Sequence, residues 1–128
     1  MTKYHSSTKE VWAPVIGWEK SYEVSTLGRV RSLERTVVRK RRKTDPDNVL
    51  HPWTFKSRII RPVLTGSYPY YPAVHLQFEG HRVSVSVSHL VVSAFNDPPV
   101  HYKNVRSVKY IDNNPRNCQS SNLIGNFI

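Results

Sequence analysis

The sequence predicts an α+β fold, in which a small antiparallel β-meander packs around one central helix. Short segments that alternate apolar and polar residues recur between turn-forming residues, as expected for half-buried strands. One segment, residues 87–95, instead carries its apolar residues at helical spacing. The strands follow one another closely along the chain, which favours antiparallel neighbours over the long crossovers that parallel strands need.

Composition indicates a basic, intracellular protein. The 128 residues suffice for one domain with an appended arm, and the net charge of +10 is typical of proteins that bind a polyanion. A single cysteine, Cys118, excludes an internal disulfide and a cysteine-based zinc site. The N-terminus lacks the apolar stretch of a signal peptide, and no apolar run reaches the length of a membrane span. We therefore expect a cytoplasmic protein without membrane contact.

The N-terminal part predicts an arm followed by a β module. Residues 1–10 are polar and predict a flexible arm. Residues 11–36 predict the β module, because Tyr22 and Val24 alternate with polar neighbours and Gly28 offers a tight turn before a second alternating strand.

A basic segment interrupts this pattern. Residues 39–43 read Arg-Lys-Arg-Arg-Lys, and such blocks of like charge repel themselves and are commonly disordered until they bind a partner. We therefore predict an inserted basic loop over residues 37–57.

The remaining part, residues 58–128, predicts further strands and the helix. We expect one strand over residues 57–64, a second over residues 70–78, and a third in which Val83, Val85 and Val87 alternate with polar residues. Within the second strand, one apolar face should consist of Val74, Leu76 and Phe78.

The helix is expected between a serine cap and a proline stop. Ser86 or Ser88 can cap its N-terminus. Its apolar stripe consists of Leu90, Val91, Ala94 and Phe95. The sequence Asp-Pro-Pro at residues 97–99 should end it.

Basic side chains cluster in and around the predicted loop, and these are the candidates for binding a nucleic-acid backbone. Arg29 and Arg31 share one face of their strand, and a β-ribbon with such a face can lie in a DNA groove. The alternative is a solvated basic surface. The candidates are Arg29, Arg31, Arg35, Arg39, Lys40, Arg41, Arg42, Lys43, Lys56, Arg58 and Arg61.

Residues 11–33 also carry a pattern that resembles the small module preceding the HNH domain in homing endonucleases of phages and mobile introns. That module has an aromatic, glycine and serine pattern in a fixed register. The matching residues are Trp12, Ile16, Gly17, Trp18, Glu19, Tyr22, Val24, Ser25, Gly28, Val30 and Ser32.

The run from Val108 to Leu123 resembles the core of the HNH motif itself, whose ββα-metal fold the resemblance implies. An HNH site cleaves phosphodiesters with one divalent metal, usually Mg²⁺. Lys109 stands where the family has a metal-binding Asp or Asn, Tyr110 stands where it has the general-base His, and Asn122 matches the middle Asn. The family helix with the last ligand would follow Ile128, so we expect a degenerate, truncated motif without a bound metal.

Each altered position also has a simple chemical reading. A protonated lysine has no lone pair to offer a metal, and tyrosine, with a pKa near 10, is a poor general base at neutral pH. Lys109 would either contact a phosphate as a fixed charge or remain a solvated lysine. Asn122 is then expected to tie its loop together, and the surrounding Asn-rich turn to serve turn chemistry rather than a substitute metal site.

The sequence thus favours a non-catalytic DNA-binding protein of phage type, derived from an HNH homing endonuclease. Such a protein could act on a host nucleoprotein machine, in the host cytoplasm or nucleoid. One alternative is an active, metal-dependent HNH endonuclease or nickase with atypical site residues, which alone would require Mg²⁺. Another is a protein-interaction inhibitor whose charge is directed at an acidic protein. RNA in place of DNA and the oligomeric state stay open.

Overall fold

The computed structural model describes residues 9–40, 42–44, 46, 49–78 and 80–128. Residues 1–8 of the expected arm, and Arg41 of the basic block, lie outside the described residues. Along the chain the elements are β1 (Trp12–Pro14), β2 (Tyr22–Ser25), β3 (Val30–Ser32), β4 (Arg35–Arg39), β5 (His51–Phe55), β6 (Arg58–Ile60), β7 (Val63–Thr65), β8 (Tyr71–Phe78), β9 (His81–Ser86), α2 (Val87–Ala94), η1 (Tyr102–Asn104), β10 (Val105–Tyr110), η2 (Ser120–Asn122) and β11 (Leu123–Phe127).

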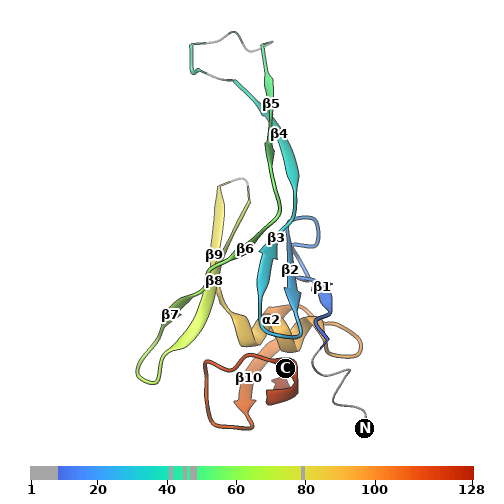
Figure 1. The fold of residues 1–128 in the computed structure, drawn as a ribbon, viewed down its shortest axis with the longest axis vertical. Coiled ribbons are helices and arrows are strands. Elements are labelled where there is room, and N and C mark those ends of the chain that lie inside the picture. The colour runs from blue at the N-terminus through green and yellow to red at the C-terminus, as the bar shows by residue number, and fades with distance from the viewer. Residues whose placement is uncertain (1–8, 41, 45, 47–48, 79) are drawn as a thin grey trace.

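The described part of the chain is α+β, with short antiparallel sheets and one α-helix. The strands do not form one meander, as we expected, but are divided over four small sheets. Their orders are β1-β2-β3-β6, β4-β5, β7-β8-β9 and β10-β11. Only the β7-β8-β9 sheet is a simple three-stranded meander, which lies beside the four-stranded sheet above α2 (Figure 1).

The predicted N-terminal strands form the four-stranded sheet. The turn between β2 and β3 needs Gly28, whose φ is +82° and whose missing side chain lets the backbone of Cys118 approach closely. A Cβ at this position would lie 2.9 Å from the Cys118 carbonyl oxygen. The turn is therefore fixed both by its own conformation and by the C-terminal loop that packs on it.

The strand expected over residues 57–64 is two strands. β6 pairs with β3, whereas β7 pairs with β8, so the chain passes from one sheet to the other. Pro62 lies at the passage between them and has no N–H with which to continue a ladder. The periodicity of the segment predicted extended backbone but could not show the change of partner.

The central helix and the strand before it follow the predicted pattern with small shifts. In β8, Val74 and Leu76 are buried, whereas Phe78, which follows them in the same alternation, is exposed at the strand end. Val87, expected in the strand, begins α2. Ser86 is the N-cap residue, but its hydroxyl bonds to the Ser88 hydroxyl instead of a helix N–H group.

The core lies where α2 packs against β2, β8 and β9 on one side and against β10 and β11 on the other. Burying these side chains supplies the main driving force for folding. The buried hydrophobic cluster consists of Val15, Tyr22, Val24, Val30, Val74, Leu76, Val85, Val87, Leu90, Val91, Ala94, Tyr102 and Cys118. Across the described ranges, no helix combines the length and apolar character needed to span a membrane.

The prediction of a loop over residues 37–57 is wrong at both ends of this segment, because residues 35–39 and 51–55 pair as the β4-β5 hairpin. The hairpin projects from the body of the molecule (Figure 1). Its strands are held by cross-strand pairs, among them Val37 opposite Trp53 and a hydroxyl contact of 3.1 Å between Thr36 and Thr54. The charged block at residues 39–43 suggested disorder, but β-branched and aromatic residues on either side favour strands.

Candidate nucleic-acid interface

Tyr110 lies at the end of β10 and faces α2. Its hydroxyl donates a 2.9 Å hydrogen bond to Ser88 Oγ, and Ser88 Oγ lies 2.9 Å from Ser86 Oγ. Burial raises the pKa of Tyr110 above the ordinary value of 10.0. The side chain is thus a neutral hydroxyl at physiological pH and is already engaged with the helix.

Lys109 precedes Tyr110 in β10 and is exposed. Adjacent side chains in a strand point to opposite faces, so Lys109 is directed away from the hydroxyl pair. Divalent ions such as Mg²⁺ take oxygen ligands, whereas Lys109 offers an ammonium group and the Tyr110 oxygen is bound to Ser88. The residues at these two positions therefore do not fit the metal that the resemblance implies.

Asn122 is buried, and its side chain holds the loop that connects β10 to β11. Its Oδ1 accepts a 3.0 Å hydrogen bond from the Asp112 N–H group. Its Nδ2 donates to Asp112 Oδ1 and to the Asn117 carbonyl oxygen, both at 2.9 Å. The amide therefore acts within the loop, as the sequence predicted.

The other polar residues of this loop also bond to the loop itself. Asp112 Oδ1 accepts from the Asn114 N–H group at 2.8 Å, and Asn114 Oδ1 accepts from the Arg116 N–H group at 3.1 Å. A hydrogen bond from Asn117 is the main cause that lowers the pKa of Asp112. Within the described ranges, His, Cys, Asp and Glu side chains form no group of three or more that could hold a metal ion.

Replacing Asn122 by alanine is expected to destabilise the protein by about 1–3 kcal/mol, because buried hydrogen-bonding groups of the loop lose their partner. The measurement is the free energy of unfolding in urea. Asn126→Ala, an exposed change on the neighbouring strand β11, is the control and should alter stability little. Equal stability of the Asn122 variant and the wild type would show that the loop does not depend on this amide.

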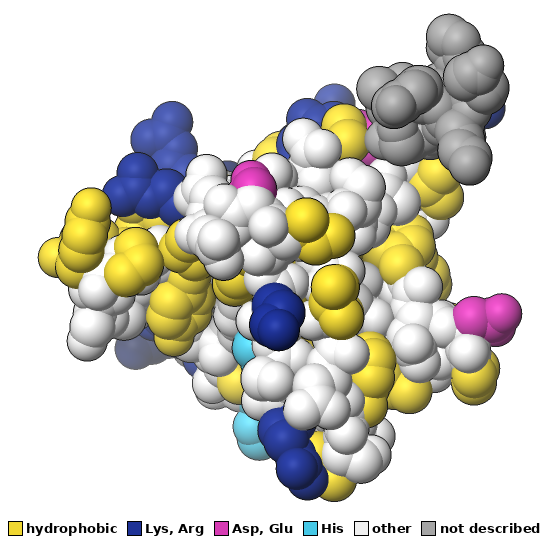
Figure 2. Space-filling model, turned by 90° about the horizontal axis from the view of Figure 1, so that it is seen from below, with side chains coloured by type: hydrophobic (Ala, Val, Ile, Leu, Met, Phe, Trp, Pro, Cys, Tyr) yellow, Lys and Arg dark blue, Asp and Glu magenta, His cyan; other side chains and the backbone are white. Residues whose placement is uncertain are grey.

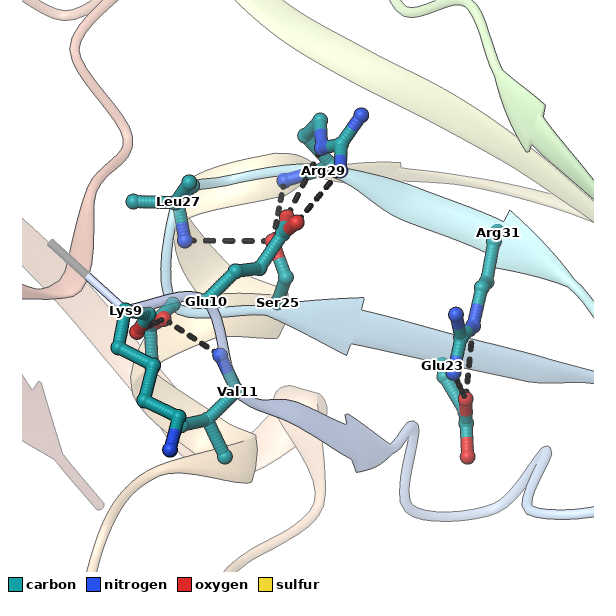
Figure 3. A network of polar contacts seen from close by, with 9 residues as sticks. Lys9, Glu10, Val11, Glu23, Ser25, Leu27, Arg29 and Arg31 are labelled. Carbon is teal, nitrogen blue, oxygen red and sulfur yellow. Dashed lines mark hydrogen bonds and ion pairs between the residues drawn. The ribbon is translucent and has the colours of Figure 1, made fainter.

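Arg31 lies in β3 and Arg29 directly precedes it; both guanidinium groups lie over the Trp12 ring, and both are paired with acidic side chains (Figure 3). Arg29 Nε lies 2.8 Å from a Glu10 carboxylate oxygen, and this contact is the main cause that lowers the pKa of Glu10 to about 2. Arg31 Nε lies 2.8 Å from Glu23 Oε1, and its guanidinium lies 4.0 Å from the Trp12 ring centroid.

These two arginines are therefore less available to phosphates than their charge suggested. Neither Glu10 nor Glu23 was among the predicted site residues. The signal for Glu23 was its place opposite Arg31 in the predicted hairpin. Glu10 lies in the segment expected to be an arm, where no local pattern predicted a partner.

Arg35 and Arg39 lie on the exposed hairpin and contact its aromatic side chains. The Arg35 guanidinium lies 5.4 Å from the Phe55 ring centroid. The Arg39 guanidinium lies 5.4 Å from the Trp53 centroid and 5.6 Å from that of Phe55. These distances suit cation–π contacts, which hold both cations on one face of the ribbon. Trp53 and Phe55 were not among the predicted site residues, although their alternation in the sequence was a signal.

The remaining predicted cations lie at the two ends of the hairpin and beside it. Lys40, Arg42 and Lys43 belong to the connection at its tip. Lys56 and Arg58 follow the hairpin at its root, where they line a cleft of about 690 Å³. Arg61 lines a smaller apolar pocket of about 360 Å³ between β6, β8 and the start of α2. Lys and Arg side chains also lie on the face away from the hairpin tip (Figure 2).

The buried His89 side chain is expected to make the stability of the folded protein decrease at acidic pH. Its Nδ1 atom is buried without a hydrogen-bond partner, and burial lowers the pKa of His89 below its ordinary value of 6.5. As pH falls through that ordinary value, the unfolded chain takes up the proton before the folded one. Stability is therefore complete above about pH 6.5 and falls as pH decreases towards the lower folded pKa.

Replacing His89 by glutamine should remove this component. The check is the difference in unfolding free energy between about pH 7.5 and about pH 5.5, which should be smaller in the variant than in the wild type. His81→Gln, which changes an exposed histidine, is the control. An unchanged pH dependence in the His89 variant would contradict the assignment.

Comparison with solved structures shows a protein of similar fold. A solved structure of the HNH homing endonuclease I-HmuI, from work on its DNA binding and cleavage, is similar with a TM-score of 0.60 and 20% identity. The likeness covers 91% of this chain and 52% of that chain, so this chain spans about half the length of that enzyme. At this identity the likeness shows a shared fold. No curated protein matches the chain.

The N-terminal resemblance is confirmed by a family model. The NUMOD4 motif matches residues 10–74, which includes the predicted module and continues through the β4-β5 hairpin into β8. The match spans half of the 128 residues. The chain therefore belongs to the NUMOD4 motif family.

Proposed function

We propose that this protein binds duplex DNA through the β4-β5 hairpin and does not cleave it. The observation that carries the proposal is the hairpin itself, a projecting two-stranded ribbon whose residues are almost all exposed. Its outward face carries Arg35 and Arg39 against aromatic rings, and further cations occupy its tip. The major groove of B-DNA, about 12 Å wide, admits a two-stranded β-ribbon.

Charge supports this partner. The chain has a net charge of +10, and phosphate neutralisation by lysine and arginine supplies most of the sequence-independent affinity for DNA. The similarity in fold to a DNA-cleaving homing endonuclease and the NUMOD4 match favour DNA over an acidic protein or RNA. Lys109, on the exposed face of β10, would add a contact to a phosphate.

The lack of cleavage rests on the altered HNH-like positions. The Tyr110 hydroxyl is neutral and bonded to Ser88, so it cannot accept a proton from an attacking water. The loss of a general base alone lowers a reaction rate by about 10²–10⁴-fold. Lys109 brings a positive charge where the family has a metal ligand, and the Asn122 amide is bonded within its own loop.

One experiment tests both halves of the proposal. A labelled duplex is titrated with the protein by fluorescence anisotropy, and supercoiled plasmid is incubated with the same protein and Mg²⁺ or Mn²⁺. We expect binding that weakens steeply with salt and no nicking. Nicking that disappears in chelator would overturn the non-catalytic assignment, and absence of binding at low salt would overturn the choice of DNA.

The double substitution Lys109→Asp with Tyr110→His is not expected to restore cleavage, because Asn122 and Asp112 remain bonded to one another. The plasmid assay measures this directly. Nicking by the double variant would show that the remaining parts of a nuclease site are in place.

The proposal extends to a nucleoprotein partner. The hairpin would allow the protein to occupy DNA that is also held by a host machine, as the resemblance to phage proteins implies. A pull-down from expressing cells, with and without nuclease treatment, checks this extension. Partners that remain after nuclease treatment would indicate a direct protein contact.

A further inference from the structure

A cleft of about 690 Å³ lies where the root of the β4-β5 hairpin meets β6 and β8. Its volume is within the range of about 300–1,000 Å³ that is common for small-ligand sites. The cleft is separate from the hairpin tip and from the HNH-like loop, since its walls come from β2, β3, β4, β5, β6 and β8.

The charged side chains that line the cleft are all basic. Arg35, Lys56 and Arg58 line it together with His75, and no acidic side chain is among its lining residues. Its hydroxyl groups are already engaged: Ser57 Oγ donates to the Ser32 carbonyl oxygen at 2.7 Å, and Thr54 Oγ1 lies 3.1 Å from Thr36 Oγ1. The cations are therefore the groups that would recognise a ligand, and an anion is the ligand they fit.

The cleft also contains an exposed aromatic ring. The Phe55 side chain is 41% exposed and lines the cleft, with the Arg35 guanidinium 5.4 Å from its centroid. A ring beside cations suits a ligand that joins a phosphate to a flat base, because bases stack on aromatic side chains with little regard to sequence. A free inorganic anion would make no use of the ring.

The floor of the cleft is held rigidly. The Tyr22 hydroxyl accepts from the Gln77 N–H group at 3.0 Å and donates to the Gln77 carbonyl oxygen at 3.1 Å, which joins β2 to β8. Pairing of β3 with β6 fixes Arg58 opposite Ser32. A site held in this way loses little freedom when a ligand binds.

We propose that this cleft binds an unstacked, single-stranded segment of DNA, with phosphates at Arg35, Lys56 and Arg58 and a base against Phe55. The inference rests on the proposed DNA-binding function and names a second substrate form for it. Arg39 and the cations at the hairpin tip would hold the duplex, and the cleft at the hairpin root, which includes Arg35 and Phe55, would hold a strand that has left the duplex beside it.

The test uses two labelled probes, a short oligothymidylate and an abasic oligomer of the same length. Both carry phosphates, but only the first carries bases. We expect the full-length protein to bind oligothymidylate about tenfold more tightly than the abasic oligomer, the size of effect that one stacked base produces. Equal affinity for the two probes would overturn the proposal and leave only a phosphate-binding surface.

Variants locate the effect. Phe55→Leu should bring the two affinities close together, whereas Phe55→Trp should keep the preference, and Arg58→Gln should weaken both probes alike. Phe78→Leu and Arg106→Gln change an exposed ring and an exposed cation outside the cleft and serve as controls. A preference that survives in a folded Phe55→Leu variant would overturn the assignment to this cleft.

The experiments separate a failure of the cleft proposal from a failure of duplex binding by the hairpin. Duplex binding that does not depend on the hairpin tip would count against the hairpin but would leave the comparison of the two single-stranded probes unchanged. A lost base preference in a protein that still binds duplex would count against the cleft alone.

Discussion

Replacing Arg39, Lys40, Arg42 and Lys43 together by glutamine is expected to weaken duplex binding strongly and to flatten its salt dependence. Each lysine or arginine that neutralises a phosphate releases counterions, so four lost contacts should reduce the slope of log affinity against log salt by about 3–4. The measurement is fluorescence anisotropy with one labelled duplex over a series of salt concentrations.

The control must change the net charge by the same amount elsewhere. Exposed cations outside the hairpin provide it, as a variant in which glutamine replaces Lys20, Lys103, Arg106 and Arg116. This variant should keep most of the slope. If both variants lose affinity equally, binding depends on total charge, and the hairpin has no special part in it.

Replacing Leu90 by alanine is expected to destabilise the protein by about 2–5 kcal/mol, the range for a fully buried leucine. Leu90 has no exposed surface and lies in α2, which packs against both the β8-β9 strands and the β10-β11 pair. The cavity would therefore loosen the contact between the two parts of the core. The measurement is the free energy of unfolding in urea, with the slope of the transition compared between proteins.

Val92→Ala on the same helix is the matched control. Val92 is only half-buried, so the change removes less apolar contact and should cost clearly less stability. If the two substitutions cost the same, α2 does not hold the core in the way that its burial indicates.

Local patterns predicted the elements well where neighbours in sequence decide the structure. The alternation around Tyr22 and Val24 predicted β2, and the stripe containing Leu90 and Val91 predicted α2. The hairpin was missed because the repulsion within residues 39–43 is visible locally, whereas the pairing of Val37 with Trp53 joins residues far apart in the chain.

In the candidate site, too, features that depend on neighbouring residues could be predicted, whereas contacts between distant residues could not. Register with the family motif singled out Lys109 and Tyr110, which lie at the end of β10, and predicted that Asn122 ties its loop together by hydrogen bonds. The hydrogen bond from Tyr110 to Ser88 could not be predicted, because Ser88 lies in α2, 22 residues before Tyr110 in the sequence. The cleft beside Phe55 could not be predicted either, since six strands contribute to it.

The direct pairing of β3 with β6 has a consequence for how this protein could vary or be engineered. The two strands that flank the hairpin are hydrogen-bonded to each other, so the four-stranded sheet is complete at the point where the hairpin leaves it. A ribbon of another length or sequence could therefore be exchanged at this point without changing the register beneath it. If the hairpin contacts DNA as proposed, replacing it would change the DNA contacts of the protein while the buried core stayed the same.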